Sequence, residues 1–141
     1  MKHSNTYIFS IGHSSKSINI FLDKLKENKV GVLVDVRSRP VSRFCPHFNQ
    51  NALRGTLAKA NILYLYRGQN LGGLGENVDY EKTIDELVDM VKKGSRVAVC
   101  CSEGSYLKCH RHLTLTPSFE DRGLSVIHIE YEKEPKQITR K

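Results

Sequence analysis

The sequence predicts an α/β domain in which a mainly parallel five-stranded sheet lies between two layers of helices. Short apolar runs rich in β-branched residues alternate along the chain with segments whose apolar residues recur at helical spacing. The run 30–36 is apolar almost throughout, as in a strand that is covered on both faces. Each strand-like run is followed by a loop and a helix, an order that joins parallel strands through right-handed crossovers.

The expected elements alternate regularly. Strands are expected at residues 7–11, 30–36, 62–66, 96–101 and 125–129, and helices at residues 18–25, 52–60, 84–91 and 109–122. Ser17 and Asn49 precede the first two helices and are expected to cap them. Pro117 lies inside the last helix and should kink or split it, because proline lacks the backbone donor. The segment 68–75 contains four glycines and is expected to be a connection that is neither strand nor helix.

Length and charge restrict the class of protein. The chain of 141 residues is long enough for one domain with an ordinary hydrophobic core, expected at about residues 6–130, followed by a basic tail at 131–141. The formal net charge of +7 favours contact with phosphates or acidic partners. No apolar run approaches the roughly 18 residues that span a bilayer, and residues 1–12 lack a secretory signal pattern. We therefore expect a cytoplasmic protein without membrane contact, whose four cysteines are reduced.

Unusual polar residues follow the predicted strands directly. Residues 12–14 follow the first strand, residues 35–37 close the second, and residues 101–103 end the fourth. In open parallel sheets, ligands bind outside the carboxyl ends of the strands. The sequence therefore predicts a functional site at this edge of the sheet.

Arginines are the expected ligand contacts at this edge. Guanidinium groups grip phosphate or carboxylate in two places, which makes Arg37, Arg43 and Arg111 the expected anion site. The alternative is that these arginines form internal ion pairs with Asp35 and Glu103. Asp35 in particular is expected to orient one of the arginines or to cap a loop. His110, Asn49 and Ser14 complete the predicted set of substrate-binding residues.

Three residues are candidates for chemistry. Glu103 and His13 are predicted to act as general acid and base if the strand ends bring them together. Cys101 lies at a strand end before a helix start, where backbone N–H groups and the helix dipole lower a thiol pKa, so it is a candidate nucleophile. The alternative for Cys101 is a small buried hydrophobic residue, which is also the role expected for Cys100.

No metal site is predicted. Seven residues separate Cys101 from Cys109, and together with His110 they do not complete a set of four zinc ligands. The sequence requires no cofactor. Phe44, Phe48 and Tyr66 lie near the arginine-rich loop and either stack on a base or pack in the core.

Several of these segments together resemble one family. They are 10–14 (Ser-Ile-Gly-His-Ser), 34–37 (Val-Asp-Val-Arg) with Pro40, Ser42 and Arg43, 46–49 (Pro-His-Phe-Asn), 71–73 (Leu-Gly-Gly), 101–103 (Cys-Ser-Glu) and 109–111 (Cys-His-Arg). In this order they resemble the domain of unknown function 488 family over about residues 6–130. The resemblance implies a compact α/β domain with these polar segments as its shared site, and it implies no established reaction.

These observations lead to one main hypothesis and two alternatives. The main hypothesis is a small cytoplasmic enzyme, a hydrolase or transferase, that acts on a phosphate-bearing or nucleotide-like substrate at the carboxyl ends of the strands. One alternative is a noncatalytic module that binds a nucleotide or nucleic acid. The other is rhodanese-like sulfur transfer through Cys101. The reaction, the strand order and the oligomeric state are left open by the sequence.

Overall fold

The computed structural model describes residues 6–41, 43–72, 77–102 and 114–131. Its strands are β1 Tyr7–Gly12, β2 Val32–Asp35, β3 Leu63–Tyr66, β4 Val97–Cys101 and β5 Ser125–His128. Its helices are α1 Ile18–Glu27, the 3₁₀ helix η1 Pro46–Phe48, α2 Gln50–Lys59, α3 Gly68–Leu71, α4 Tyr80–Lys92 and α5 Thr116–Glu120. None of the helices in the described ranges is long and apolar enough to cross a membrane.

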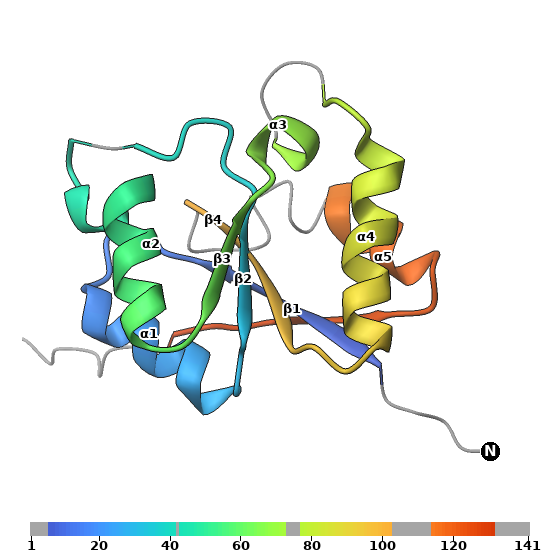
Figure 1. Ribbon diagram of the computed structural model, residues 1–141, viewed down its shortest axis with the longest axis horizontal. Coiled ribbons are helices and arrows are strands. Elements are labelled where there is room, and N and C mark those ends of the chain that lie inside the picture. Colours follow the sequence, from blue (N-terminus) through green and yellow to red (C-terminus); the bar gives the residue numbers. More distant parts are fainter. Residues whose placement is uncertain (1–5, 42, 73–76, 103–113, 132–141) are drawn as a thin grey trace, which may run out of the picture.

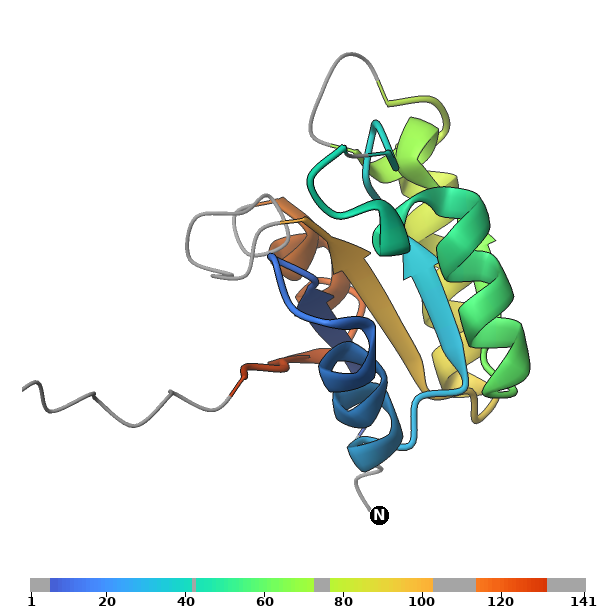
Figure 2. The same cartoon turned by 90° about the vertical axis from the view of Figure 1, so that its left-hand side faces the viewer.

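The five strands form one parallel sheet in the order β3-β2-β4-β1-β5. This confirms the predicted α/β fold class and supplies the strand order. From β1 the chain passes through α1 and α2 to reach β2 and β3, and from β3 it returns through α4 and α5 to β4 and β5. Helices α1 and α2 therefore cover one face of the sheet, while α4 and α5 cover the other (Figure 1). Figure 2 shows the same arrangement with α1 and α2 in front of the sheet.

Each face of the sheet packs against its helices as a separate apolar cluster. Phe9 and Ile11 of β1 lie in the cluster beneath α1 and α2, whereas Ile8 lies in the cluster beneath α4 and α5. The same alternation places Cys100 in the first cluster and Cys101 in the second. Burial on both faces explains why the sequence of the central strands is apolar at nearly every position.

Two predicted helix caps take their expected positions. The Ser17 side chain accepts a hydrogen bond from the backbone N–H of Ile20 at 3.2 Å and so caps α1. Asn49 occupies the N-cap position of α2, but its side chain makes no capping hydrogen bond. Its own backbone N–H instead donates to the carbonyl of Pro46, which ends η1.

The glycine-rich segment corrects one expectation. Gly68–Leu71 is helical, as α3, although the four glycines of residues 68–75 predicted neither helix nor strand. A Cβ atom at Gly68 would overlap the Arg37 carbonyl and the Tyr66 hydroxyl, and one at Gly72 would overlap the Ser38 side chain. These two glycines therefore allow α3 to pack closely against the loop after β2. They are needed for this packing and not for flexibility of the connection.

Pro117 lies in the first turn of α5, which begins at Thr116. Residues 114 and 115, directly before α5, are π-helical, and Leu115 has helical backbone angles, so the helix geometry changes just before Pro117. The expected kink or split of the longer helix stays a prediction. The part of the expected helix at residues 109–113 lies outside the described residues.

Candidate functional site

The carboxyl ends of β1 and β4 form the point at which the chain direction reverses across the sheet. The two strands are neighbours, but β1 leads to α1 on one face and β4 leads on toward α5 on the other. Pairing continues beyond the strands, since the backbone N–H groups of His13 and Ser14 donate to the carbonyls of Cys101 (3.0 Å) and Ser102 (2.8 Å). Open α/β sheets bind ligands at such a switch point.

A buried ion pair lies at the end of the adjacent strand β2. The Asp35 carboxylate is fully buried and accepts hydrogen bonds from Nε (2.8 Å) and Nη2 (2.7 Å) of Arg37 in a two-pronged arrangement. It also accepts from the Arg37 backbone N–H (3.1 Å) and from the Tyr64 hydroxyl of β3 (2.6 Å). Four donors thus satisfy a carboxylate that burial would otherwise destabilise. Asp35 orients Arg37, as expected from the sequence.

The Asp35 carboxylate also shifts the pKa values of Arg37 and Tyr64, to which it is hydrogen-bonded. Burial opposes the charge on Arg37, but the hydrogen bonds and negative charge of Asp35 outweigh it and raise the pKa of Arg37. Burial together with the hydrogen bond to Asp35 raises the pKa of Tyr64 well above its ordinary value. Tyr64 therefore stays protonated and acts as a hydrogen-bond donor at physiological pH.

His13 connects the ion pair to the switch point. Its Nε2 atom lies 3.3 Å from Nη1 of Arg37, its Nδ1 atom lies 2.6 Å from the carbonyl of Ser14, and its ring stacks on Phe48 with a centroid distance of 4.3 Å. These partners assign the tautomer, because a carbonyl requires a donor at Nδ1 and a guanidinium requires an acceptor at Nε2. Burial lowers the pKa of His13 to about 4; the hydrogen bond to Ser14 opposes this shift and the charge of Arg37 adds to it. His13 is therefore neutral at pH 7.

These contacts define what His13 and Arg37 offer to a ligand. The contacts among described residues use three of the five N–H donors of Arg37. The charge of Arg37 is compensated by Asp35, and the lone pair of His13 at Nε2 is directed at a cation. Arg37 therefore lies at the predicted edge of the sheet and also forms the internal ion pair with Asp35 that was the alternative prediction. His13 is held in place as a hydrogen-bond acceptor for Arg37.

Three of the remaining predicted binding residues, Ser14, Arg43 and Asn49, lie on three separate segments. Ser14 has a left-handed backbone with φ of 51°, and its carbonyl accepts from both His13 Nδ1 and the Cys45 thiol. Arg43 lies exposed in the loop between β2 and η1, and Asn49 is the N-cap residue of α2. His47 of η1 bonds to the carbonyl of Lys16 at 2.9 Å, which fixes η1 against the segment after β1.

Cys101 ends β4 beside Gly12 of β1 and is only 3% exposed. Its side chain belongs to the apolar cluster beneath α4 and α5, while Cys100 is buried in the opposite cluster. Both cysteines are therefore in positions typical of small hydrophobic residues. The role of Cys101 as a nucleophile stays a prediction.

The other predicted site residues, Glu103, His110 and Arg111, lie outside the described residues, as does Cys109. Among residues 6–41, 43–72, 77–102 and 114–131, no group of three or more His, Cys, Asp or Glu side chains is arranged to hold a metal ion. Of the predicted site, the structure thus brings together His13, Ser14 and Arg37.

Comparison with known proteins identifies a family for part of this site. Residues 17–80 match the family described as domain of unknown function DUF488. No curated protein and no solved structure is significantly similar to the chain.

The DUF488 match covers only some of the residues of the site. It includes Asp35, Arg37, Arg43 and the Asn49 position, together with Tyr64. The segments 10–14 and 101–111, on which the sequence resemblance also rested, lie outside the matched range. The resemblance to DUF488 is confirmed, and the match carries no reaction with it.

Tyr64 is the residue of this centre that sequence reasoning missed. It lies inside a short strand of alternating leucine and tyrosine, a pattern that indicates only a β-strand. Its hydroxyl reaches Asp35 because β2 and β3 are neighbours, with Leu33 opposite Tyr64 and Asp35 opposite Tyr66. No signal in the sequence indicates this neighbour relation.

Deeper in the sheet, His128 of β5 hydrogen-bonds to Ser10 of β1 through Nδ1 and lies 3.5 Å from Thr116 through Nε2. Ser10 is 1% exposed. These contacts connect the edge strand β5 and helix α5 to β1, so His128 has a structural role here.

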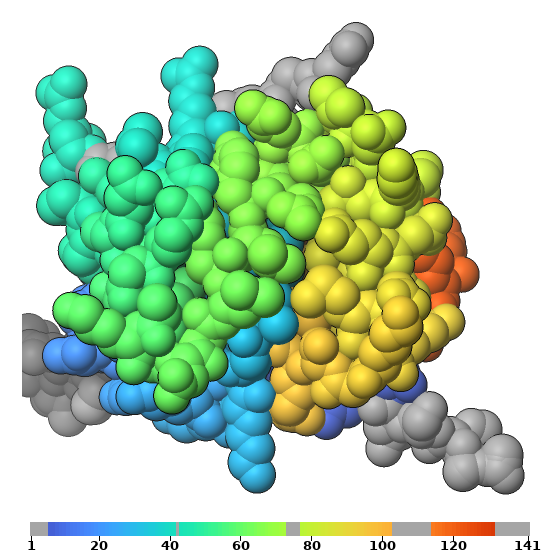
Figure 3. Space-filling model, in the orientation of Figure 1, coloured from blue at the N-terminus to red at the C-terminus, as the bar shows by residue number. Residues whose placement is uncertain are grey.

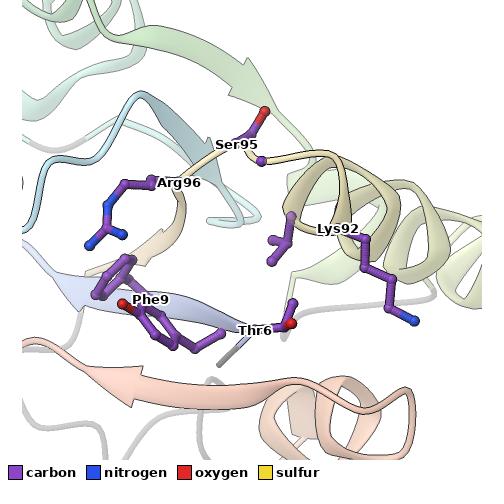
Figure 4. Close-up of a pocket in the computed structure, with 8 residues that line it drawn as sticks. Thr6, Phe9, Lys92, Ser95 and Arg96 are labelled. Atoms are coloured by element: carbon purple, nitrogen blue, oxygen red, sulfur yellow. The ribbon is translucent and has the colours of Figure 1, made fainter. Parts of the chain in front are cut away.

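A cavity of about 430 Å³ lies at the opposite, amino edge of the sheet (Figure 4). It lies between the start of β1 and the end of α4, and Arg96 stands at its side over the ring of Phe9 with Cζ 5.1 Å from the ring centroid. Nε of Arg96 donates to the carbonyl of Asn28 at 2.9 Å, so the side chain joins the starts of β1 and β4 to the end of α1. None of the predicted site residues lines this cavity.

Proposed function

We propose that the protein acts on a phosphate-bearing, nucleotide-like small molecule bound at the carboxyl edge of the sheet, beside the ends of β1, β2 and β4. The observation that carries the proposal is the contact between His13 and Arg37 at the switch point. It joins a polar loop at the end of β1 to a guanidinium whose direction is already fixed by Asp35. A site whose donors are held in place before binding loses less entropy when an anion arrives.

The positive charge for this ligand comes mainly from the loop after Arg37. Because Asp35 neutralises Arg37, that side chain contributes directed N–H groups more than net charge. Arg43 is exposed and makes no ion pair among the described residues. In this proposal Arg43 attracts the phosphate and Arg37 with Ser14 orients it, while Arg111 and His110 add contacts from the chain after β4.

The same geometry assigns His13 a positioning role in the proposed reaction. A general base needs an available lone pair, and the Nε2 lone pair of His13 faces Arg37. Proton transfer in an enzyme of this kind therefore depends on Glu103, with His13 fixing Arg37. The noncatalytic binding module is the second candidate function, and the neutral, fully engaged His13 is the observation that favours it.

Titration calorimetry with inorganic phosphate and with AMP tests the binding step. Arg43→Ala should weaken both ligands about five- to tenfold, as expected for loss of an exposed charge-assisted hydrogen bond. Lys59→Ala is the matched control, because it removes the same charge from the exposed last turn of α2. Failure of both ligands to bind, or equal weakening by the two variants, would contradict the proposed site.

A second variant distinguishes the enzyme from the binding module. Glu103→Gln keeps the size of the side chain but removes the carboxylate that transfers a proton. An enzyme should retain ligand affinity and lose roughly 10²-fold or more in turnover of nucleotides or sugar phosphates. A wild-type protein that binds these compounds and turns none of them over is the noncatalytic module.

A further inference from the structure

Residues 38–41 and 43–45, named here the basic loop, include apolar side chains that are exposed to solvent. Phe44 is 88% exposed and Val41 is 65% exposed. By contrast, the neighbouring Phe48 is fully buried, and the hydroxyl of the half-buried Tyr66 is bonded to the Ser38 carbonyl at 3.1 Å. Of the three aromatic residues that the sequence placed near this loop, Phe44 is the exposed one.

Both ends of the basic loop are held against the domain. At one end the carbonyl of Pro40 accepts a hydrogen bond from the backbone N–H of Gln50 at 2.8 Å. At the other end the thiol of Cys45, directly after Phe44, contacts the carbonyl of Ser14 at 3.7 Å. Phe44, which carries the exposed ring, is therefore the sequence neighbour of Cys45, which contacts the switch point directly. Figure 3 shows side chains of this segment, coloured cyan, standing out from the top of the molecule.

The surroundings of Phe44 are basic. From residue 36 to residue 75 the chain contains no Asp or Glu, while it contains six Lys and Arg residues. Arg39 and Arg43 flank the exposed apolar residues, are themselves exposed, and form no ion pair within the described residues. An exposed aromatic ring between arginines matches the two parts of a nucleotide, since the base stacks on a ring and the phosphate pairs with guanidinium groups.

A single exposed hydrophobic side chain is common on protein surfaces and needs no ligand. Phe44 differs in three respects: it lies on a loop held at both ends, beside arginines that form no ion pair with any described residue, and next to the residues of the proposed phosphate site. We propose that Phe44 is the stacking platform for a nucleobase whose phosphate occupies the carboxyl edge. This inference rests on the proposed function and narrows its substrate class from phosphate-bearing molecules to nucleoside 5′-phosphates.

The nucleobase and its phosphate can come from two sources, a free mononucleotide or a single strand of nucleic acid. Both present the same chemistry to Phe44 and the arginines. A mononucleotide fills the site alone, whereas a strand adds phosphate contacts along the basic loop and gains a steeper dependence of affinity on salt. The experiment therefore includes both ligands.

Binding of four probes to the wild type, Phe44→Ala and Val41→Ala tests the inference. The probes are inorganic phosphate, ribose 5-phosphate, AMP and an oligouridylate of about eight nucleotides. AMP should bind the wild type about tenfold or more tightly than ribose 5-phosphate, and Phe44→Ala should remove this difference while leaving phosphate and ribose 5-phosphate unchanged. Val41→Ala, which truncates another exposed apolar residue of the same loop, should change none of the affinities.

A fluorescent variant gives an independent measurement. The protein contains no tryptophan, so Phe44→Trp places the only indole at the proposed platform. Stacking of a base should quench its emission on addition of AMP, and ribose 5-phosphate should not. Affinity for the oligouridylate that exceeds that for AMP and falls steeply with salt identifies the single strand as the source, and comparable affinities identify the mononucleotide.

Other outcomes would overturn the inference and would separate it from the proposed function. If AMP and ribose 5-phosphate bind equally and Phe44→Ala changes neither, the phosphate site stands and the stacking platform is rejected. If none of the four probes binds, both proposals fall. If Phe44→Ala changes the oligomeric state in light scattering but not nucleotide affinity, Phe44 is a protein contact.

Discussion

The buried neutral His13 should make the stability of the protein depend on pH in a specific window. In the folded chain its pKa is lowered from 6.5 to about 4, chiefly by burial, and the side chain is 4% exposed. In the unfolded chain the histidine recovers its ordinary pKa. Between these two values the unfolded state binds the additional proton, so the free energy of unfolding must fall as the pH is lowered.

The size of the effect follows from the two pKa values. Above pH 6.5 both states carry a neutral His13, and its full contribution to stability is present. At pH 5 the unfolded histidine is mostly protonated while the folded one is mostly neutral, which costs about 2 kcal/mol relative to pH 7.5. A loss of this size is a large fraction of the 5–15 kcal/mol that stabilises a typical domain.

Urea denaturation of the wild type and His13→Gln at pH 7.5 and pH 5 measures this effect. Glutamine can still accept from Arg37 and donate to the Ser14 carbonyl, but it does not titrate. The variant should lose about 2 kcal/mol less than the wild type between the two pH values, whatever its stability at pH 7.5. A parallel decline in both proteins, or an NMR titration that gives His13 a pKa near 6.5, would refute the assignment of a buried neutral imidazole.

Two further predictions concern stability. Asp35→Asn leaves the buried charge of Arg37 without its counterion and should reduce the free energy of unfolding by about 3–5 kcal/mol in urea denaturation, whereas a loss below about 1 kcal/mol would show that the pair contributes little. Gly68→Ala should lower the melting temperature, because the added Cβ meets a backbone carbonyl, while Gly55→Ala in α2, where a Cβ meets nothing within 4 Å, should stabilise the protein by about 0.5–1 kcal/mol. Equal melting temperatures for the two alanine variants would contradict the close packing of α3 on the loop after β2.

Local patterns in the sequence were sufficient to predict most of the strands and helices, and to predict which edge of the sheet carries the polar residues. Apolar runs and helical spacing predicted five strands and the three longer helices, because burial of one or both faces leaves a period in the sequence. The same patterns failed at Gly68–Leu71, where glycine is present because a side chain would collide with residues distant in sequence. A collision of this kind leaves no local period.

The sequence by itself determined that His13 and Arg37 follow strand ends, and that parallel strands present those ends at one edge. Only the tertiary structure decided what these residues do there. The order β3-β2-β4-β1-β5 brings Tyr64 to Asp35 and Arg37 to His13. Burial in the assembled sheet keeps the imidazole neutral, and Asp35 compensates the charge of the guanidinium. Strand order depends on long-range pairing, and ionisation depends on burial and on the neighbours that pairing supplies. Neither is encoded in the spacing of residues along the chain, so the assembled sheet was required to show that Nε2 of His13 faces Arg37.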